Sequence, residues 1–437
     1  MRVVVVGGGL TGLATALGLT RAGHDVQLFE ASGRAGGAVA SIERDGFVME
    51  QGAGSLRGAH RDVYQLLADA GVTDAVIPSS PQASNRFLLQ GGQLVGLPKG
   101  PGGLFGIPRL GRRGALRLLQ EPLRPARRWG GAEETVHAFL ARRLGRRAAD
   151  ALADPLMAGI FGGDPRRLEV ASAFPDWVQW ERDHGSLVLG AIRSRTTPPH
   201  GMPSGTFSLR GGVGTLVDAL VDQLGDRLHL HTEVTALHRD RTGLRVIADG
   251  ATVDADHVVL TCPLEAARQL LPDAPAGWLA DIPVAPIAAV HLAYDGPSVP
   301  DGLPGFGYLV HSGERTDLLG CLWVSGAFPE HAPAGQHLVR FMMGGARDPS
   351  QARRTDEQLI EHARSLMQTV QGVRAEPLFA QVNRAIIPQY PPGYARRLRL
   401  LGQLDPRVDL AGWWWGQLGV AGSARAAADL VRRLRNR

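Results

Sequence analysis

The chain opens with a regular succession of apolar and polar segments. Residues Arg2–Val6 form a continuous β-branched run, which is typical of a parallel strand buried on both faces. A glycine turn follows directly, and Leu13–Ala22 then predicts an Ala/Leu-rich helix that ends at Gly23. A second strand, Asp25–Phe29, ends on Glu30. This strand–loop–helix–strand order predicts the first unit of an α/β domain.

Further strands and helices are predicted by the same patterns later in the chain. Leu228–Asp240 predicts a strand in which apolar and polar residues alternate, and Asp254–Pro263 predicts a second, apolar strand. Val408–Ala411 predicts a strand that is followed by the final helix. Residues 133–161 place apolar side chains at three- and four-residue steps, which indicates helices. The runs AAVHLAY, GFGYLV, LLGCLWVS and HLVRFMMGG predict a sheet with one covered face within residues 279–400.

Length and composition favour a large, loop-rich enzyme. The 437 residues are 44% hydrophobic, enough for a large core and, by length, for two or three domains. The 57 glycines and 29 prolines are spread along the chain, unlike those of a low-complexity protein. The two cysteines, Cys262 and Cys321, are far apart and outside any C-x-x-C pattern. We therefore expect neither a disulfide framework nor a metal site, and a cytoplasmic location.

Other patterns exclude further classes of protein. The first residues predict a strand and a glycine loop rather than a cleavable signal peptide. No stretch approaches the ~20 apolar residues that a membrane-spanning helix needs. The formal charge is +5, but basic residues do not alternate with aromatic ones as in platforms for single-stranded nucleic acids. We expect no nucleic-acid partner.

The glycine turn carries the first candidate chemistry. Gly7, Gly9 and Gly12 spell G-x-G-x-x-G between a predicted strand and a predicted helix. In that context the three glycines permit the tight turn, the approach of a pyrophosphate and close helix–strand packing. The phosphates are expected at the amino end of the helix, where its dipole favours negative charge. Glu30 is placed to accept the hydroxyls of an adenosine ribose. The motif predicts a dinucleotide site rather than an ordinary glycine-rich turn.

The residues after Glu30 indicate which dinucleotide is bound. Arg34, Gly36 and Gly37 complete E-x-x-x-R-x-G-G, which is similar to the extension found in flavin amine-oxidase-type proteins. This resemblance implies non-covalent FAD. The glycines of MEQGAGS, and a final helix whose amino end can face the N1/O2 edge of the flavin, are consistent with it. For the tryptophan triplet 413–415, core or interface packing is an equal alternative. The expected cofactor-binding residues are Gly7, Gly8, Gly9, Leu10, Thr11, Gly12, Glu30, Ala31, Arg34, Gly36, Gly37, Ala38, Gly52, Ala53, Gly54, Ser55, Val234, Thr261, Trp413, Leu418, Gly419 and Val420.

Several longer strings narrow the resemblance. SNRFLLQGGQLVGLP, ETVHAFLARRLG, GIFGGDPRRLEVASAFP, LRGGVGTLVDAL and GFGYLV resemble the protoporphyrinogen oxidase family, and with the flavin motifs they cover most of the chain. One segment departs from the family pattern, because Ala421, Gly422 and Ser423 replace the Asn or Asp-Cys stretch that often follows the last glycine turn. That departure puts individual flavin contacts there in doubt.

The resemblance implies a fold class, a domain organisation and an activity. The expected fold is α/β with α+β insertions. It comprises a Rossmann-like FAD-binding domain of the amine-oxidase/PHBH type, a mixed-sheet substrate domain and a helical, candidate membrane-contact domain. The FAD-binding domain is expected to comprise residues 1–80, 200–278 and 400–437. The substrate domain is expected to comprise residues 81–98 and 279–399, and the helical domain residues 99–199. The implied reaction oxidises protoporphyrinogen IX to protoporphyrin IX by six electrons in haem biosynthesis, with O2 as acceptor and H2O2 as product.

The resemblance also implies substrate-site residues. Arg86 falls where the family places its propionate-binding arginine, and the Gly159 carbonyl is the candidate for polarising a pyrrole N–H. The side chains that match tetrapyrrole contacts are Phe306, Leu309, Leu322 and Met342. From the residues alone, Arg86 would be an ordinary surface arginine and those four would be core residues.

Two further questions stay open at this point. Lys99–Arg128 has eight basic residues against one acid, Glu121, and suits either anionic lipid headgroups at the inner face of a membrane or an ordinary solvated loop. Coproporphyrinogen III is the alternative substrate, which would be oxidised to coproporphyrin III. The protein could instead be another flavin amine oxidase or a desaturase. The third alternative is a protein that binds flavin but catalyses no reaction. A homodimer is compatible with all of them.

Overall fold

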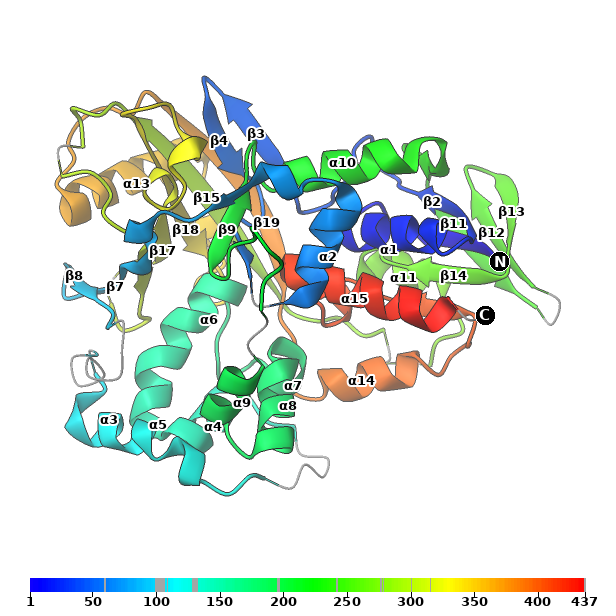
Figure 1. Ribbon diagram of the computed structural model, residues 1–437, viewed down its shortest axis with the longest axis horizontal. Coiled ribbons are helices and arrows are strands. Elements are labelled where there is room, and N and C mark those ends of the chain that lie inside the picture. The colour runs from blue at the N-terminus through cyan, green and yellow to red at the C-terminus, as the bar shows by residue number, and fades with distance from the viewer. Residues whose placement is uncertain are drawn as a thin grey trace.

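The computed structural model describes residues 1–58, 60–98, 107, 109–127, 133–194, 197–240, 243–275, 277, 279–299, 301–314 and 316–435. Figure 1 shows three regions in this part of the chain. A parallel sheet with its helices lies beside both labelled chain ends, a larger sheet lies at the opposite upper side, and a group of helices lies below. We call them the parallel-sheet lobe, the large-sheet lobe and the helical lobe.

A five-stranded parallel sheet is the centre of the first lobe. Its order is β10 (Leu228–His229), β2 (Asp25–Phe29), β1 (Arg2–Val6), β14 (His257–Leu260) and β20 (Val408–Leu410). The central strand β1 pairs with β2 from Arg2 to Val6 and with β14 from Val3 to Val6. Residues 3–6 are buried because both faces of the sheet are covered, which confirms the prediction of a doubly buried strand.

The two faces of β1 belong to different hydrophobic clusters. Val3 and Val5 pack with helices α1 (Leu10–Arg21), α2 (Arg61–Ala70), α10 (Gly214–Leu224) and α15 (Gly419–Leu434). Val4 and Val6 pack toward α11 (Leu264–Leu270) and an antiparallel sheet of β11 (Val234–Arg239), β12 (Leu244–Ala248) and β13 (Ala251–Ala255). Successive residues of a strand point to opposite faces, so one β-branched run supplies both cores.

Two expectations about this lobe are wrong in detail. The first helix begins at Leu10 rather than Leu13, because Gly12 is accommodated within its first turn. Leu228–Asp240 is not one strand: β10 joins the parallel sheet and β11 joins the antiparallel sheet. The chain changes direction between them at His231, which has a positive φ of 54°. The alternation of apolar and polar residues in the sequence does not indicate such a turn.

A seven-stranded sheet forms the second lobe. Its order is β19 (Phe379–Pro388), β15 (Val284–Tyr294), β18 (His337–Gly344), β17 (Leu318–Trp323), β16 (Gly307–Val310), β7 (Arg86–Gln90) and β8 (Gln93–Gly96). Helix α13 (Asp356–Gln371) packs on one face through Leu359, Ala363 and Met367. The predicted sheet is confirmed, but its opposite face is also partly covered, by the hairpin of residues 41–50 and by residues 154–161. Residues 86–96 extend the sheet by parallel pairing of β7 with β16.

Shorter elements connect the lobes. The hairpin of β3 (Ser41–Arg44) and β4 (Phe47–Glu50) packs against the large sheet through Phe47 and Met49, and β5 (Leu56–Arg57), β9 (Thr206–Leu209) and β6 (Val76–Pro78) form a small sheet. The remaining short elements are η1 (Thr73–Ala75), η2 (Pro81–Ser84), η6 (Gly225–Arg227), α12 (Val324–Ala327), η7 (Pro329–His331), η8 (Gln351–Arg353), α14 (Tyr394–Leu401) and η9 (Trp413–Trp415).

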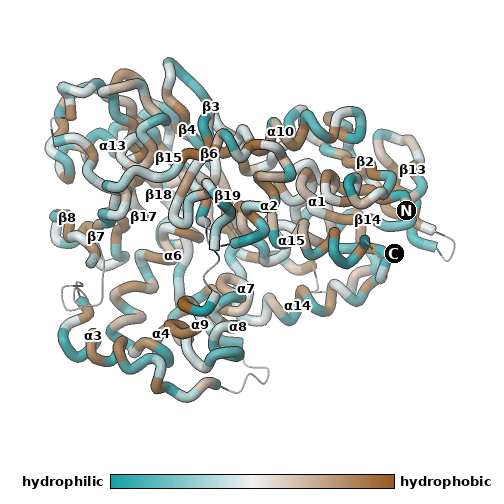
Figure 2. The backbone as a smooth tube through the Cα atoms, in the orientation of Figure 1, coloured by the Kyte–Doolittle hydropathy of each residue, from teal (hydrophilic) through white to brown (hydrophobic). Residues whose placement is uncertain are grey.

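The third lobe is helical, as predicted. It contains α3 (Gly111–Leu119), η4 (Glu121–Leu123), α4 (Val136–Leu144), α5 (Arg146–Ala148), the π-helical turn η5 (Ala149–Ala153), α6 (Asp154–Phe161), α7 (Val170–Ala173), α8 (Pro175–His184) and α9 (Leu187–Arg193). Figure 2 shows hydrophobic and hydrophilic stretches alternating along α3 and α9 at the lower end of the molecule. In the described residues, no helix is both long and apolar enough to cross a bilayer.

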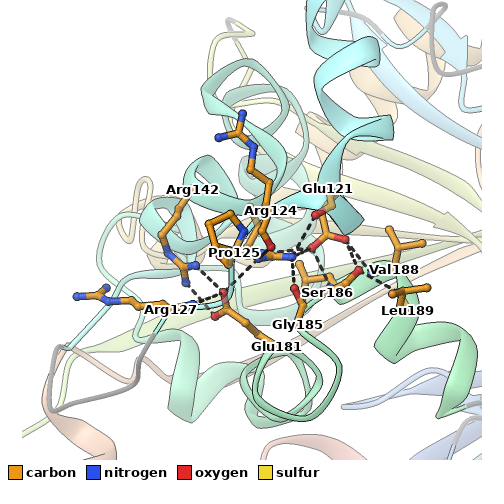
Figure 3. Close-up of polar contacts among 12 residues, drawn as sticks. Glu121, Arg124, Pro125, Arg127, Arg142, Glu181, Gly185, Ser186, Val188 and Leu189 are labelled. Atoms are coloured by element: carbon orange, nitrogen blue, oxygen red, sulfur yellow. Dashed lines mark hydrogen bonds and ion pairs between the residues drawn. The ribbon is translucent and has the colours of Figure 1, made fainter.

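A cluster of buried charged side chains lies in the helical lobe (Figure 3), in addition to the apolar core around Val136, Phe139 and Leu140. Arg143, Glu121 and Glu181 have fully buried side chains, and Arg143 forms ion pairs with both acids. Arg142 donates to Glu181 at 2.6 Å and to Glu134 at 2.9 Å. Burial alone would raise the pKa of Glu121, but hydrogen bonds from Ser186, the Leu187 amide and Arg143 outweigh it and lower the pKa. The network ties η4, α4, α8 and α9 together.

Candidate active site

The nucleotide loop, residues 7–12, is built so that it cannot carry side chains at two of its three motif glycines. Gly7 has a φ of 105°, and a Cβ on Gly12 would lie 2.0 Å from the Gly7 carbonyl oxygen. A Cβ on Gly9, in contrast, would meet no atom within 4 Å. Open space therefore lies in front of Gly9, next to the first amides of α1, which lack intrahelical acceptors. This cradle fits the pyrophosphate of a dinucleotide.

The second glycine pair packs directly on this loop. The Gly36 amide donates to the Gly8 carbonyl at 2.8 Å, and a Cβ on Gly37 would lie 3.2 Å from the Gly9 Cα. The guanidinium of Arg34 donates to the Gly37 carbonyl at 2.8 Å. The structure thus brings the E-x-x-x-R-x-G-G extension against the first motif, as two neighbouring walls of one site.

Glu30 has more partners than the sequence analysis anticipates. Its carboxylate accepts from the Gly8 amide at 2.6 Å and from the Ser32 amide and hydroxyl at 2.9 and 2.6 Å. These bonds fix the carboxylate beside the loop. Because an ionised carboxylate has about four acceptor positions, one remains for a ribose hydroxyl. Ala31 lies between Glu30 and Ser32, on the same turn.

Thr261 lies underneath the nucleotide loop. Its hydroxyl lies 3.0 Å from the Val6 carbonyl and 2.7 Å from the Gly7 carbonyl, so it holds the turn from the neighbouring strand end. Gly412, from the C-terminal segment, approaches the Thr11 hydroxyl from the other side. Val234 begins β11, two residues after Thr232, whose amide donates to the Glu30 carbonyl. All these residues surround one end of the parallel sheet.

Residues 50–55 lie between the nucleotide loop and the large sheet, and we call them the junction segment. A Cβ on Gly52 would lie 2.0 Å from the Ala38 carbonyl, whereas one on Gly54 would lie 3.6 Å from Leu322 and 3.3 Å from Arg340. The segment is therefore in contact with the cofactor side through Gly52 and with the large sheet through Gly54. Ala53 and Ser55 lie next to these glycines in the chain.

Glu50, at the start of the junction segment, was not expected to have a role. Its carboxylate accepts from the Val213 amide at 2.7 Å, next to the amino end of α10, and from the Ser41 hydroxyl at 2.8 Å. Burial raises the pKa of Glu50 to about 7, although these two hydrogen bonds and the charge of Arg340 act in the opposite direction.

The C-terminal segment is held by two tyrosines that the sequence analysis missed. Tyr390 donates its hydroxyl proton to the Trp413 carbonyl and Tyr394 donates to the Trp414 carbonyl, while the two phenol rings stack with centroids 5.2 Å apart. Trp415 is packed in the core with 4% of its surface exposed. The turn leads to Leu418, Gly419 and Val420 at the amino end of α15. Tyrosine–carbonyl contacts leave no signal in the sequence, because any residue can supply the carbonyl.

The face of the large sheet opposite α13 brings the expected substrate-site residues together. Leu322 pairs with Gly307 on one side and with Arg340 on the other, and Gly320 pairs with Leu309 and with Met342. Paired residues point to the same face, so the side chains of Leu309, Leu322 and Met342 lie on one side of the sheet, opposite α13. Phe306 packs with Leu322 on a small apolar cluster at the edge of this face.

Arg86 lies at the rim of the same face. Its guanidinium carbon is 4.2 Å from the centre of the Phe306 ring, and its Nη2 lies 3.5 Å from the Thr206 hydroxyl. Among the described residues, Arg86 has no ion pair with a carboxylate. Partial burial and, secondarily, the charge of Arg57 lower the pKa of Arg86. Arg57 pairs across β5 and β9 with Thr206, so a second cation accompanies Arg86.

Gly159 lies in the last turn of α6, beneath Leu309. A Cβ on Gly159 would come within 2.8 Å of the Leu309 side chain, so the glycine permits that packing. The amide of Gly163, which would cap the Gly159 carbonyl in a continuing helix, instead donates to the Met157 carbonyl at 3.2 Å. The helix ends at Gly162 in the left-handed conformation, and the Gly159 carbonyl loses its helical donor as a result.

Arg340 is the main residue of this face that the sequence analysis missed. It lies two residues before Met342 on β18 and therefore points to the same side. Its signal is visible in HLVRFMMGG, where one arginine interrupts an apolar strand. His291, its neighbour on β15, is fully buried.

Comparisons with known proteins agree with this arrangement. The family model of flavin-containing amine oxidoreductases matches residues 10–432. The chain is 33% identical to human protoporphyrinogen oxidase and 30% identical to the mitochondrial protoporphyrinogen oxidase of Nicotiana tabacum. These matches cover 91% and 98% of this chain and 89% and 94% of the relatives. It is also 29% identical to coproporphyrinogen III oxidase of Bacillus subtilis, over 91% of this chain and 89% of that protein.

Solved structures have the same fold. A protein from Exiguobacterium sp. 255-15, provisionally assigned as a protoporphyrinogen oxidase, superposes with a TM-score of 0.82 at 26% identity, covering 100% of this chain and 98% of that one. Cyclohexylamine oxidase from Brevibacterium oxydans superposes with a TM-score of 0.71 at 19% identity, covering 99% of each chain. The predicted α/β fold of the amine-oxidase type is confirmed.

The match over nearly the whole chain, together with the loop that fits a dinucleotide pyrophosphate, identifies both family and cofactor. The chain is a member of the flavin-containing amine oxidoreductase family, and its cofactor is FAD.

Proposed function

We propose that the protein oxidises protoporphyrinogen IX to protoporphyrin IX, a six-electron oxidation in three flavin turnovers, with O2 reduced to H2O2. One observation carries the proposal. The guanidinium of Arg86, which has no ion pair with a carboxylate among the described residues, lies at the rim of an apolar sheet face that contacts the junction segment. A flat apolar macrocycle with carboxylates on one edge is complementary to such a face.

The bound flavin supplies a hydride acceptor, and the chain supplies binding and orientation. Arg86 binds a propionate and is held in place by its contact with the Phe306 ring. Leu309, Leu322 and Met342 provide apolar contacts to the macrocycle and exclude water from it. The expected cofactor-binding residues, of which Gly7 is the first in the chain and Val420 the last, hold the dinucleotide, and Gly9 faces the pyrophosphate.

The Gly159 carbonyl is proposed to accept a hydrogen bond from a pyrrole N–H. The loss of its helical donor supports this role, because it leaves the exposed carbonyl able to accept a hydrogen bond from a ligand. Such a bond would orient the macrocycle relative to Leu309, which packs on Gly159.

Coproporphyrinogen III is the second candidate substrate. It carries four propionates instead of two, and the proximity of Arg57 to Arg86 favours a substrate with more than one carboxylate near this rim. The 29% identity to the Bacillus subtilis enzyme supports the same alternative. It differs from the first proposal in substrate but not in reaction.

The test is anaerobic mixing of the purified flavoprotein with each porphyrinogen. We expect protoporphyrinogen IX to bleach the flavin absorbance, and air to restore it with formation of H2O2 and fluorescent porphyrin. Faster turnover of coproporphyrinogen III would favour the second candidate. A flavin that neither porphyrinogen bleaches would contradict both.

We further propose that the helical lobe contacts an anionic membrane surface, as a peripheral protein on its cytoplasmic face. Lys99–Arg128 was the expected segment, and residues 99–106, 108 and 128 lie outside the described part. In the described part, α3, η4 and α9 expose large apolar side chains that we call the apolar patch: Leu116, Leu119, Leu123, Val188 and Ile192. Exposed Arg112, Arg113, Arg124 and Arg193 lie beside it. This combination supports interfacial binding.

The division into domains is part of the same proposal. Residues 1–80, 200–278 and 400–437 would bind FAD, residues 81–98 and 279–399 the porphyrinogen, and residues 99–199 the membrane. The pairing of β7 with β16 supports placing the first short segment with the second long one.

A further inference from the structure

Arg340 is a buried cation without an ion-pair partner. It is 8% exposed, and its Nε is buried without a hydrogen-bond acceptor. Its Nη1 donates to the Gly52 carbonyl at 2.9 Å. In the described residues no carboxylate forms an ion pair with it. The nearest acid that acts on it is Glu50, whose own carboxylate is engaged by the Val213 amide and Ser41.

Glu50 compensates the charge of Arg340 only in part, because burial raises the pKa of Glu50 to about 7. Burial and the neighbouring arginine hold the pKa of His291 well below its ordinary value, so this imidazole is neutral at physiological pH. An arginine keeps its charge even when buried. A buried charge left without compensation costs several kcal/mol. A site that retains it is expected to use it.

The position of Arg340 indicates where its charge acts. Arg340 and its cross-strand partner Leu322 both touch Gly54 of the junction segment. That segment contacts the cofactor side through Gly52, whose carbonyl is the acceptor for Arg340. The guanidinium therefore lies where the large sheet meets the segment that packs on Ala38, an expected cofactor-binding residue, and not at the rim with Arg86.

We propose that Arg340 is an electrostatic positioning residue for the flavin: its fixed positive charge stabilises the negative charge that the isoalloxazine ring gains on two-electron reduction. A hydride brings two electrons and one proton, and the ring then carries one net negative charge until O2 accepts the two electrons and, with two protons, becomes H2O2. The inference rests on FAD binding, and not on which porphyrinogen is the substrate. A fixed charge near a flavin tunes its reduction potential.

The test uses the flavin-loaded protein without any porphyrinogen. Sulfite, which adds to electron-poor flavins, is the probe. We expect Arg340→Gln to weaken sulfite binding about tenfold and to lower the two-electron potential by the equivalent ~30 mV. Arg340→Lys, which keeps a charge, should recover most of both. Arg44→Gln, at an arginine that lies 4.5 Å above the Phe379 ring outside the site, is the matched control, and it should leave both quantities unchanged.

Wild-type protein gives a measurement that does not depend on the variants folding. Reduced anaerobically at pH 6, its flavin should have the absorbance of the anionic reduced form. A neutral reduced flavin there would overturn the inference, as would unchanged sulfite affinity and potential in Arg340→Gln. A variant that changes only the KM for porphyrinogen would assign Arg340 to the substrate and also overturn it. Failure of porphyrinogen to bleach the wild-type flavin would instead contradict the proposed function.

Discussion

The guanidinium carbon of Arg86 lies 4.2 Å from the centre of the Phe306 ring, and the same guanidinium has no ion pair with a carboxylate in the described part of the chain. The ring holds a cation at the edge of an apolar face without consuming its hydrogen-bond donors. An anionic substituent of the substrate can therefore take those donors.

Arg86→Ala should raise the KM for porphyrinogen while FAD content stays unchanged. Loss of a charge-assisted hydrogen bond costs ~1.5–3 kcal/mol, which corresponds to about a 10- to 150-fold rise. Steady-state fluorescence assays and the flavin-to-protein absorbance ratio measure the two effects. Arg44→Ala is the matched control, because Arg44 lies 4.5 Å above the Phe379 ring outside the site. An unchanged KM in Arg86→Ala would remove this residue from the substrate site.

Valine at two glycines of the nucleotide loop should give two different defects. Gly9→Val should yield folded, colourless protein, because its side chain enters the open space in front of the loop. Gly12→Val should misfold, because even a Cβ there lies 2.0 Å from the Gly7 carbonyl oxygen. Circular dichroism and flavin absorbance separate the outcomes. Gly205→Val, also into open space, should retain FAD. Yellow Gly9→Val protein would contradict the placement of the pyrophosphate.

Arg143→Met should strongly destabilise the helical lobe. The substitution leaves Glu121 buried without its ion pair and weakens the compensation of Glu181. Breaking a buried pair costs ~3–5 kcal/mol. Limited proteolysis should cut residues 107–194 much faster than in wild type. Arg146→Met, at an exposed arginine three residues along the chain, should have little effect. Equal cleavage rates in the two variants would mean that the buried ion pairs of Arg143 do not contribute to the stability of the helical lobe.

Glu50 should make the protein less stable as pH rises from about 4.5 to 7. Burial raises the pKa of Glu50 from 4.5 to about 7 in the folded protein. Over that interval the folded state holds a proton that the unfolded state has released, so its stability declines with increasing pH, by at most about 3 kcal/mol.

Glu50→Gln should remove this slope. The thermal midpoint of the variant relative to wild type should therefore be higher at pH 8 than at pH 5. Glu43→Gln, at an exposed position of the same hairpin, serves as the control. A difference between wild type and Glu50→Gln that does not change with pH would show that Glu50 is ionised throughout.

Removal of two residues of the apolar patch should reduce membrane binding. Leu123 and Ile192 are 84% and 55% exposed, and the double change to serine removes apolar area that would enter the interface. Flotation with vesicles that contain anionic lipid measures the bound fraction, which should fall severalfold. Leu378→Ser is the matched control, because Leu378 is 53% exposed outside this lobe. Binding that persists in the double variant and is insensitive to salt would contradict the proposal.

The sequence predicts the regular parts of this fold well because their burial is periodic. Strand β1 is bounded correctly at Arg2 and Val6, since both of its faces are covered. The turn at His231 is missed because a positive φ at a histidine has no apolar signature. The buried network is missed because its partners are distant in the chain: Ser186 donates to Glu121 across 65 positions.

In the candidate site too, some residues can be predicted from the sequence and others cannot. The glycine motifs predict the nucleotide loop because the steric requirement acts on adjacent residues. The grouping of Arg86 with Phe306 depends on the parallel pairing of β7 and β16, which joins residues 221 positions apart in the chain. The grouping was expected from the resemblance to the protoporphyrinogen oxidase family and not from the pattern of residues. Arg340 is detectable as a site residue only once β18 is known to place it on the same face as Met342, opposite α13.

The inward orientation of carboxylates in the helical lobe changes how its charge is presented. Within the described part of residues 107–194, Glu121, Glu134, Asp154, Glu169 and Glu181 are buried, whereas Arg143 is the sole buried arginine. Acids are thus withdrawn from the exterior while guanidiniums stay on it. The electrostatic potential at the surface of the lobe is therefore more positive than the numbers of its acidic and basic residues imply.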